Sequence, residues 1–134
     1  MTLDISAFEK AIARLTEGLA RYQRDISDEQ IRDGLIQRFE SPYELSHKML
    51  KRYLEAESAS PEQDDSMPFQ DLIRTGNEQG LLLGDWPVWR TWRDMRGKAN
   101  HPYDEKTALE VVAGIPAFLN DAGFLRDQLR RRLA

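Results

Sequence analysis

The sequence predicts an all-α fold, namely an antiparallel up-and-down four-helix bundle with one extra short helix. Apolar residues recur three and four positions apart along almost the whole chain, which is the spacing of a helix with one buried face. Four long stretches carry such a stripe, and the short connections between them favour antiparallel neighbours. The 134 residues show no internal repeat, so we predict one helical-bundle domain over residues 1–134.

The first two predicted helices meet near Ser27. Ser27 followed three residues later by Gln30 resembles a capping box, which predicts the start of the second helix. Pro42 lies inside that helix and predicts a kink, because proline removes a backbone hydrogen bond. The apolar stripe of the first helix is Ile5, Phe8, Ile12, Leu15, Leu19, Tyr22 and Ile26. The residues expected on the buried face of the second are Ile31, Leu35, Phe39, Leu45, Met49, Leu50 and Tyr53.

A loop and a short helix follow in the middle of the chain. Residues 57–68 are acidic and contain proline, which predicts an exposed loop before a short helix over residues 69–78. Asp85 with Pro87 predicts the start of the fourth helix, since proline is tolerated in a first helical turn. The core residues expected on this helix are Val88, Trp92, Met95 and Ala99.

The last helix is predicted to begin after a tight turn. Pro102 disfavours helical backbone at the residue before it, so the fourth helix should end near Asn100. We expect Asp104 to cap the last helix and Pro116 to kink it. Its expected core residues are Ala108, Val111, Ile115, Phe118, Ala122, Leu125 and Leu129.

Composition excludes several classes of protein. The net charge of −4 argues against a protein that coats nucleic acid without specificity, because that task needs a broad basic surface. Without cysteine there is no disulfide and no thiolate metal site. No run of eighteen apolar residues and no secretory signal is evident, so we expect a cytoplasmic chain without a membrane span. Cofactor-binding fingerprints are absent as well, and we predict no cofactor.

The segment RGKANHPY places Arg96, His101 and Tyr103 within eight positions. On an unbroken helix Arg96 and His101 would point about 140° apart, but a helix that ends before Pro102 lets His101 turn back. Gly97 inside the helix suggests close backbone approach there. An exposed His at a helix end is the simpler interpretation of His101, since its charge suits the helix dipole.

An arginine and a histidine without metal ligands suit attack at a phosphate. Histidine exchanges protons near neutral pH, and arginine holds phosphate oxygens and stabilises developing charge. Because RNA carries its own nucleophile in the 2′-hydroxyl, such a pair could cleave RNA without a metal. A homodimer with two pairs across a two-fold cleft would supply both a base and an acid.

The same residues resemble a known family. Arg96, His101 and Tyr103 match the Arg-x4-His-x-Tyr motif of HEPN domains, and DGLIQRFE with MRGKANHPYDEKTA is similar to nucleotidyltransferase substrate-binding proteins, also called HepT-like toxins. The resemblance runs roughly from Phe8 to Leu125. It implies a dimeric helical bundle that pairs with a minimal nucleotidyltransferase (MNT) antitoxin.

The resemblance also implies roles for particular residues. Arg96 and His101 would catalyse metal-independent cleavage of an RNA substrate, and AMPylation of Tyr103 by the partner would silence the toxin. Gly97 departs from the family, where the residue after the motif arginine is usually polar. The residues assigned to phosphate or substrate binding are Arg93, Lys98 and Asn100.

Two other sequence features admit a functional and a structural interpretation. Glu44 and His47 have the Glu-x-x-His spacing of di-iron bundles, but a second motif is missing, so a surface or interface histidine is favoured and no metal is predicted. Glu40 and Glu44 could form a like-charge pair tuned by Arg38 or Lys48.

Aromatic and basic clusters complete the candidate surfaces. Tryptophans at positions 86, 89 and 92 could stack on bases, but burial in the bundle or at a homodimer interface is favoured. The arginines at positions 130–132 are expected to be a solvated helix end, with contact to RNA or an acidic partner as the alternative.

Two non-catalytic hypotheses remain beside the ribonuclease. The chain could be a subunit that presents a nucleotide or acceptor to a separate nucleotidyltransferase, with Arg93, Arg96 and His101 forming an anion pocket. It could also be an inactive helical adaptor that keeps the fold for protein contacts.

Overall fold

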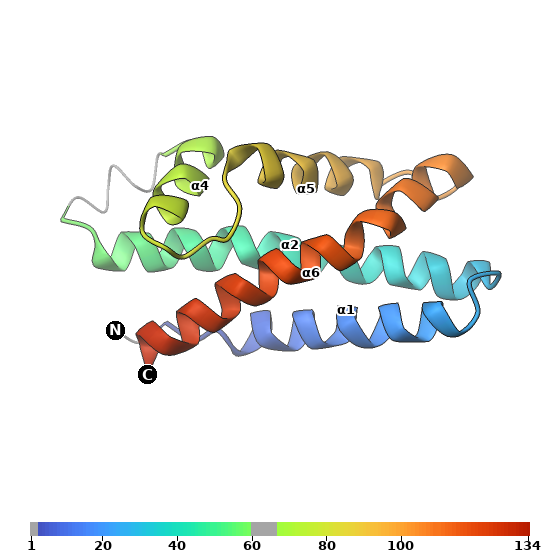
Figure 1. Ribbon diagram of the computed structural model, residues 1–134, viewed down its shortest axis with the longest axis horizontal. Helices are drawn as coiled ribbons and strands as arrows, with labels where there is room; N and C mark the ends of the chain where they lie inside the picture. The colour runs from blue at the N-terminus through green and yellow to red at the C-terminus, as the bar shows by residue number, and fades with distance from the viewer. Residues whose placement is uncertain (1–2, 60–66) are drawn as a thin grey trace.

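Five α-helices make up the computed structural model, which describes residues 3–59 and 67–134 (Figure 1). Their bounds are α1 Ser6–Arg24, α2 Glu29–Glu57, α4 Phe69–Glu78, α5 Trp86–Lys98 and α6 Glu105–Leu133. These two ranges contain no β-strand, so the all-α prediction is confirmed. The predicted short helix is α4, whereas most of the predicted loop before it lies outside the described residues.

The long helices α1, α2 and α6 contact one another pairwise, with α1 and α2 antiparallel and side by side (Figure 1). Helices α4 and α5 follow each other along the remaining side of α2, so together they take the place of one long helix. The turn from α5 to α6 lies at the same end of the bundle as the turn from α1 to α2. That arrangement brings the RGKANHPY segment to the first half of α2.

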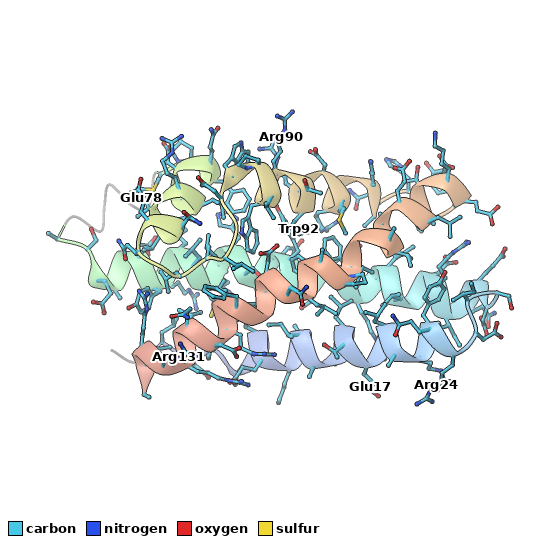
Figure 2. All side chains as sticks on the ribbon, viewed as in Figure 1. Glu17, Arg24, Glu78, Arg90, Trp92 and Arg131 are labelled. Atoms are coloured by element: carbon cyan, nitrogen blue, oxygen red, sulfur yellow. The ribbon has the colours of Figure 1, made fainter. Side chains whose placement is uncertain are left out.

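An aromatic cluster joins three helices in the core. Phe118 of α6 is fully buried, and its ring contacts Phe39 of α2 with the ring centroids 4.8 Å apart. The rings of Trp89 and Trp92 from α5 approach Phe118 edge-on. The indole of Trp92 also donates a 3.0 Å hydrogen bond to the carboxylate of Asp121. The packing interpretation of these two tryptophans is therefore confirmed, and Figure 2 shows Trp92 directed into the bundle.

Two residues of the predicted core are exposed instead. The side chain of Ile26 is 71% exposed because α1 ends at Arg24 and the apolar spacing continues beyond the helix. Val88 is 38% exposed because the buried stripe of α5 begins with Trp89. The seven core residues predicted for the last helix are all buried.

Asp28, and not Ser27, caps α2. One carboxylate oxygen of Asp28 accepts hydrogen bonds from the backbone N–H groups of Gln30 and Ile31, at 3.0 and 3.1 Å. The hydroxyl of Ser27 instead donates to Asp25. The helix start predicted at Asp85 and the cap predicted at Asp104 are confirmed, since each side chain accepts from a backbone N–H of the first turn that follows it.

Neither internal proline ends its helix. Helix α2 continues on both sides of Pro42 and α6 continues on both sides of Pro116, so the predicted kinks do not divide either helix. The carbonyl of Pro42 accepts a 2.7 Å hydrogen bond from the buried hydroxyl of Ser46. A polar side chain in the α2 core is thereby satisfied within its own helix.

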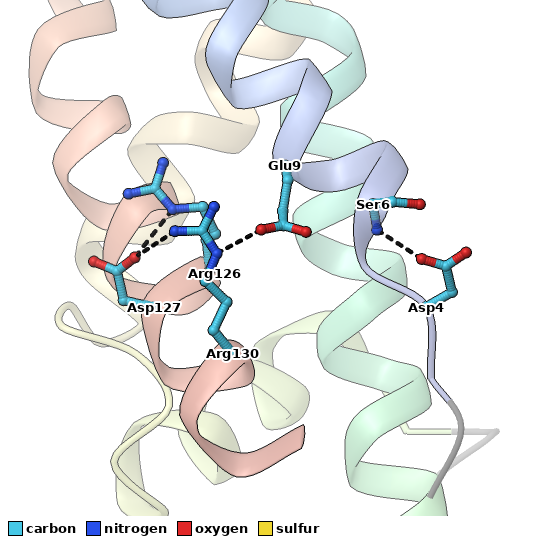
Figure 3. A network of polar contacts seen from close by, with 6 residues as sticks. All are labelled: Asp4, Ser6, Glu9, Arg126, Asp127 and Arg130. Carbon is cyan, nitrogen blue, oxygen red and sulfur yellow. Dashed lines mark hydrogen bonds and ion pairs between the residues drawn. The ribbon is translucent and has the colours of Figure 1, made fainter. Parts of the chain in front are cut away.

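The arginines at the end of α6 bind within the chain. Arg130 forms ion pairs with Glu9 of α1 and with Asp127, as Figure 3 shows. Arg132 donates to the backbone carbonyl of Gln79, 2.6 Å away. Two of the three terminal arginines therefore tie α6 to its neighbours, although all three are exposed, as expected of a solvated helix end.

Helix α6 is long and apolar enough to cross a membrane by length and composition alone, with a mean hydropathy of 1.3 over its most apolar window. In the structure 44% of that window is buried, and α6 packs against α1, α2 and α5. A core helix passes the same test as a membrane span, and the burial of its apolar face accounts for its composition here.

Candidate functional site

The candidate site is built on the last turn of α5 and the turn that follows it. Ala99 and Asn100 still make backbone hydrogen bonds to carbonyls of α5, and the N–H of His101 donates to the carbonyl of Lys98. Pro102 cannot extend this pattern. Asp104 then accepts from the N–H of Lys106 and opens α6. The turn holds His101 and Tyr103 immediately beyond the helix that carries Arg96.

Arg96 is held from two directions. Its Nε and Nη2 atoms donate to the same oxygen of Glu44 in α2, at 3.3 and 3.1 Å. Its Nη1 donates to the side-chain oxygen of Asn100, 2.9 Å away and one turn later on the chain. Glu40 lies 3.8 Å from Nη1. Two carboxylates and one amide therefore surround a guanidinium whose side chain is 24% exposed.

His101 pairs with Tyr103 and not with Arg96. The Nδ1 atom of His101 lies 2.8 Å from the hydroxyl of Tyr103, and the two rings meet edge-on. Both side chains are exposed, Tyr103 to 82%. Among the described residues no hydrogen bond joins His101 to Arg96, so the expected return of the histidine toward the arginine is not found.

The expected close approach at Gly97 is wrong. A β-carbon added to Gly97 would meet no atom within 4 Å, because this face of α5 is open. Lys98 next to it pairs with Glu110 of α6 at 2.8 Å, and that hydrogen bond is the main cause of the raised pKa of the lysine. Arg93 lies over the ring of the half-buried Trp86. Of the predicted phosphate- or substrate-binding residues, only Asn100 contacts Arg96.

A hollow of about 420 Å³ adjoins this site. It lies between the first half of α2 and the turn after α5. Two of the residues that line it, Glu40 and Asn100, also contact Arg96. The complete lining is Asp33, Ile36, Gln37, Glu40, Ala99, Asn100 and Pro102.

Sequence reasoning missed the partner of the two glutamates. Glu40 and Glu44 form ion pairs with Arg96 of α5, whereas Arg38 donates to the backbone carbonyl of Arg14. The one-turn spacing of the two carboxylates was the available signal, because it puts them on one face of α2. Their cation lies 52 residues from Glu44 and belongs to another helix, so local spacing did not reveal it.

His47 is a packing residue. Its ring lies 4.2 Å from the ring of Phe69 of α4, centroid to centroid. Burial there lowers the pKa of His47, and the nearby Lys51 lowers it further. In the described part of the chain no three His, Cys, Asp or Glu side chains gather as metal ligands. The Glu44–His47 spacing therefore has no di-iron geometry around it.

Comparison with known proteins assigns this arrangement to a family. The model of the family described as "Nucleotidyltransferase substrate binding protein like" matches residues 3–131. A protein of Haemophilus influenzae named "Probable ribonuclease HepT" is 39% identical over 110 residues, which cover 82% of this chain and 75% of that protein. A solved H. influenzae structure, described as the substrate binding domain of a nucleotidyltransferase, aligns with a TM-score of 0.88 and 32% identity. That alignment covers 95% of this chain and 99% of the other.

The burial of His47 predicts a loss of stability in mild acid. Because its folded pKa lies below the unfolded value, the unfolded chain binds the proton first as the pH falls through about 6.5. Neutral His47 therefore stabilises the fold fully above that pH, and this stabilisation is lost as the pH falls toward the lower pKa of the folded state. In urea unfolding at about pH 8 and pH 5.5, the wild type should lose more stability than His47→Leu. Equal losses in the two proteins would contradict this account.

Proposed function

The chain belongs to the nucleotidyltransferase substrate-binding family of HepT-like proteins, and on this premise we propose that it is the ribonuclease toxin of a toxin–antitoxin pair. It cleaves RNA without a metal ion, as a homodimer, and its partner is a minimal nucleotidyltransferase. The main support is the end of α5, which carries an anchored guanidinium and, five residues later in the sequence, an exposed histidine. The relative named as a probable ribonuclease supports the same reaction.

Arg96 binds the scissile phosphate in this proposal. The 2′-oxygen attacks phosphorus while the bond from phosphorus to the 5′-oxygen breaks, which leaves a 2′,3′-cyclic phosphate and a 5′-hydroxyl. One histidine removes the proton of the 2′-hydroxyl, and a second donates a proton to the departing 5′-oxygen. The guanidinium stabilises the charge that develops on the phosphoryl oxygens. Because each chain has one His101, the two protomers of a dimer supply the base and the acid.

Glu44 binds the same N–H groups of Arg96 that a phosphate would bind. Two guanidinium N–H groups point at one oxygen of Glu44, and a phosphate binds through the same fork. The Glu44 side chain is 63% exposed, so it can turn into water when phosphate arrives. Asn100 and Glu40 remain to orient the arginine. Glu44 is thus a counter-ion that substrate replaces.

Tyr103 is the proposed site of silencing. It is exposed, whereas the other three tyrosines of the chain are buried, at 7–8% exposure. In AMPylation its hydroxyl oxygen attacks the α-phosphorus of ATP and pyrophosphate leaves. The new phosphodiester puts a negative charge where the hydroxyl now meets His101, and it repels an RNA phosphate.

A nucleotide-binding subunit without catalysis is the second candidate. The solved relative described as a substrate binding domain supports it. The same carboxylates around Arg96 would then tune an anion pocket for the nucleotide handled by a separate nucleotidyltransferase. Metal-independent RNA cleavage separates the two candidates.

Arg96→Ala and His101→Ala are each expected to lower the rate of RNA cleavage in EDTA by about 100-fold or more, because acid–base and charge-stabilising groups contribute effects of this size. Arg90→Ala is the matched control, since Arg90 is an exposed arginine on the same helix. The assay follows cleavage of a single-stranded RNA and analyses the product ends. Cleavage that persists in a folded His101→Ala protein would contradict the assignment.

Glu44→Gln is expected to tighten binding of an uncleavable 2′-deoxy oligonucleotide about two- to fivefold, the equivalent of one exposed ion pair. The gain arises because phosphate no longer displaces a charged competitor from Arg96. Glu78→Gln removes the same charge from an exposed position at the end of α4 and serves as the control. Calorimetry that gives both variants the same affinity would count against a displaceable Glu44.

Tyr103→Phe is expected to abolish AMPylation by the partner nucleotidyltransferase. The measurement is intact-protein mass spectrometry after incubation with ATP, in which the wild type gains AMP. Tyr53→Phe should still gain it, because Tyr53 is buried. If Tyr103→Phe is modified as readily as the wild type, another residue accepts the group.

A further inference from the structure

The hollow beside Arg96 has the dimensions and lining of a small-molecule subsite. Its volume of about 420 Å³ lies within the range of ligand pockets in proteins. Ile36 and Ala99 are almost fully buried beneath it, and the half-buried Pro102 supplies the apolar surface that a ligand would meet. Four polar side chains complete the lining: Asp33, Gln37, Glu40 and Asn100. Small-molecule sites in proteins typically combine apolar walls with a few polar groups that fix the orientation of the ligand.

The polar lining favours hydrogen-bond donors over anions. It includes two carboxylates and two amides, and no lysine or arginine lines the hollow. Carboxylates accept hydrogen bonds and repel phosphate. Although Arg32 lies 3.6 Å from Asp33, the phosphate of a ligand is better placed at the Arg96 guanidinium. A ligand that carries both a phosphate and a donor-bearing ring would fit the two adjacent sites together.

Direct contacts link the two sites. Glu40 and Asn100 line the hollow and also touch the Arg96 guanidinium, with closest distances of 3.8 and 2.9 Å. Pro102 lines it too and is adjacent in sequence to both His101 and Tyr103. A group in this hollow therefore lies next to the phosphate that Arg96 would bind.

We propose that this hollow is a nucleobase subsite that accepts adenine, cytosine or guanine and discriminates against uracil. The inference rests on the proposed function, and it identifies the nucleobase that the protein would recognise next to the cleaved bond. Adenine, cytosine and guanine each carry an exocyclic amine that donates to carboxylate or amide oxygens. Uracil has no such amine, and the one donor on its pairing edge, N3–H, lies between two carbonyl oxygens that Asp33 and Glu40 would repel. Proteins commonly read single-stranded RNA through base edges in this way.

The first test uses RNA of random sequence and reads the nucleotides around each cut. In wild-type products, uridine should be about fivefold or more rarer than the other bases at one fixed position next to the cleaved bond. A factor of this size is expected when one hydrogen-bonded contact to a base edge is lost. Asp33→Asn combined with Gln37→Leu should reduce that depletion to less than about twofold. An amide at position 33 can donate to uracil, and without Gln37 its carbonyl oxygen no longer accepts from the amine of the other bases. Some cleavage should remain to be analysed, since Arg96 and His101 are intact in this variant.

The matched control combines Asp71→Asn with Gln70→Leu, two exposed residues on α4. This protein should keep the wild-type depletion of uridine. Cleavage by the wild type without any depletion, or equal depletion in the two double variants, would overturn the nucleobase subsite and leave the ribonuclease intact.

A second measurement separates failure of the subsite from failure of the proposed function. If the wild type does not cleave RNA, the ribonuclease proposal fails, and calorimetry with AMP and UMP then tests the hollow alone. Tighter binding of AMP than of UMP, with the preference lost in the Asp33–Gln37 double variant, would support the subsite in a nucleotide-binding protein. Equal affinities for AMP and UMP would overturn it.

Discussion

The attachment of Arg96 to α2 is the contact on which the geometry of the site depends. The guanidinium fixes the end of α5 against the carboxylates of Glu40 and Glu44, and Asn100 holds it from the following turn. One positive charge is thus shared between two negative ones, and in the proposed mechanism a phosphate replaces one of the carboxylates. The same contact places the nearby hollow and the His101 turn around a single guanidinium.

Packing of the core sets the direction in which Arg96 points. Trp89 and Trp92 are buried against Phe118, and this fixes the rotation of α5 about its axis. Arg96 follows Trp92 by four residues, so it lies on the edge of the buried stripe and faces α2. Arg90 lies one position from Trp89 and is exposed (Figure 2). Arginines on one short helix therefore have different surroundings because the tryptophans orient that helix.

Local sequence patterns predicted most of the helices but not the contacts between them. The spacing of apolar residues identified the buried face of α6 correctly, whereas Ile26 continued the α1 pattern past the end of its helix. Ser27 and Asp28 are neighbouring residues that both cap well, and only the turn geometry selects Asp28. The motif indicated Arg96, His101 and Tyr103. Their partners come from tertiary packing, which is why Glu44 and, apart from Asn100, the lining of the hollow were not assigned to the site.

Nuclear magnetic resonance of the Arg96 Nε–H group tests the central claim most directly. The signal, assigned by its loss in Arg96→Lys, would be followed while an uncleavable 2′-deoxy oligonucleotide is added. If phosphate replaces Glu44 at the guanidinium, this signal shifts with the same saturation curve as binding measured by calorimetry. Binding that leaves the Arg96 signal unmoved and shifts only other arginines would contradict the account.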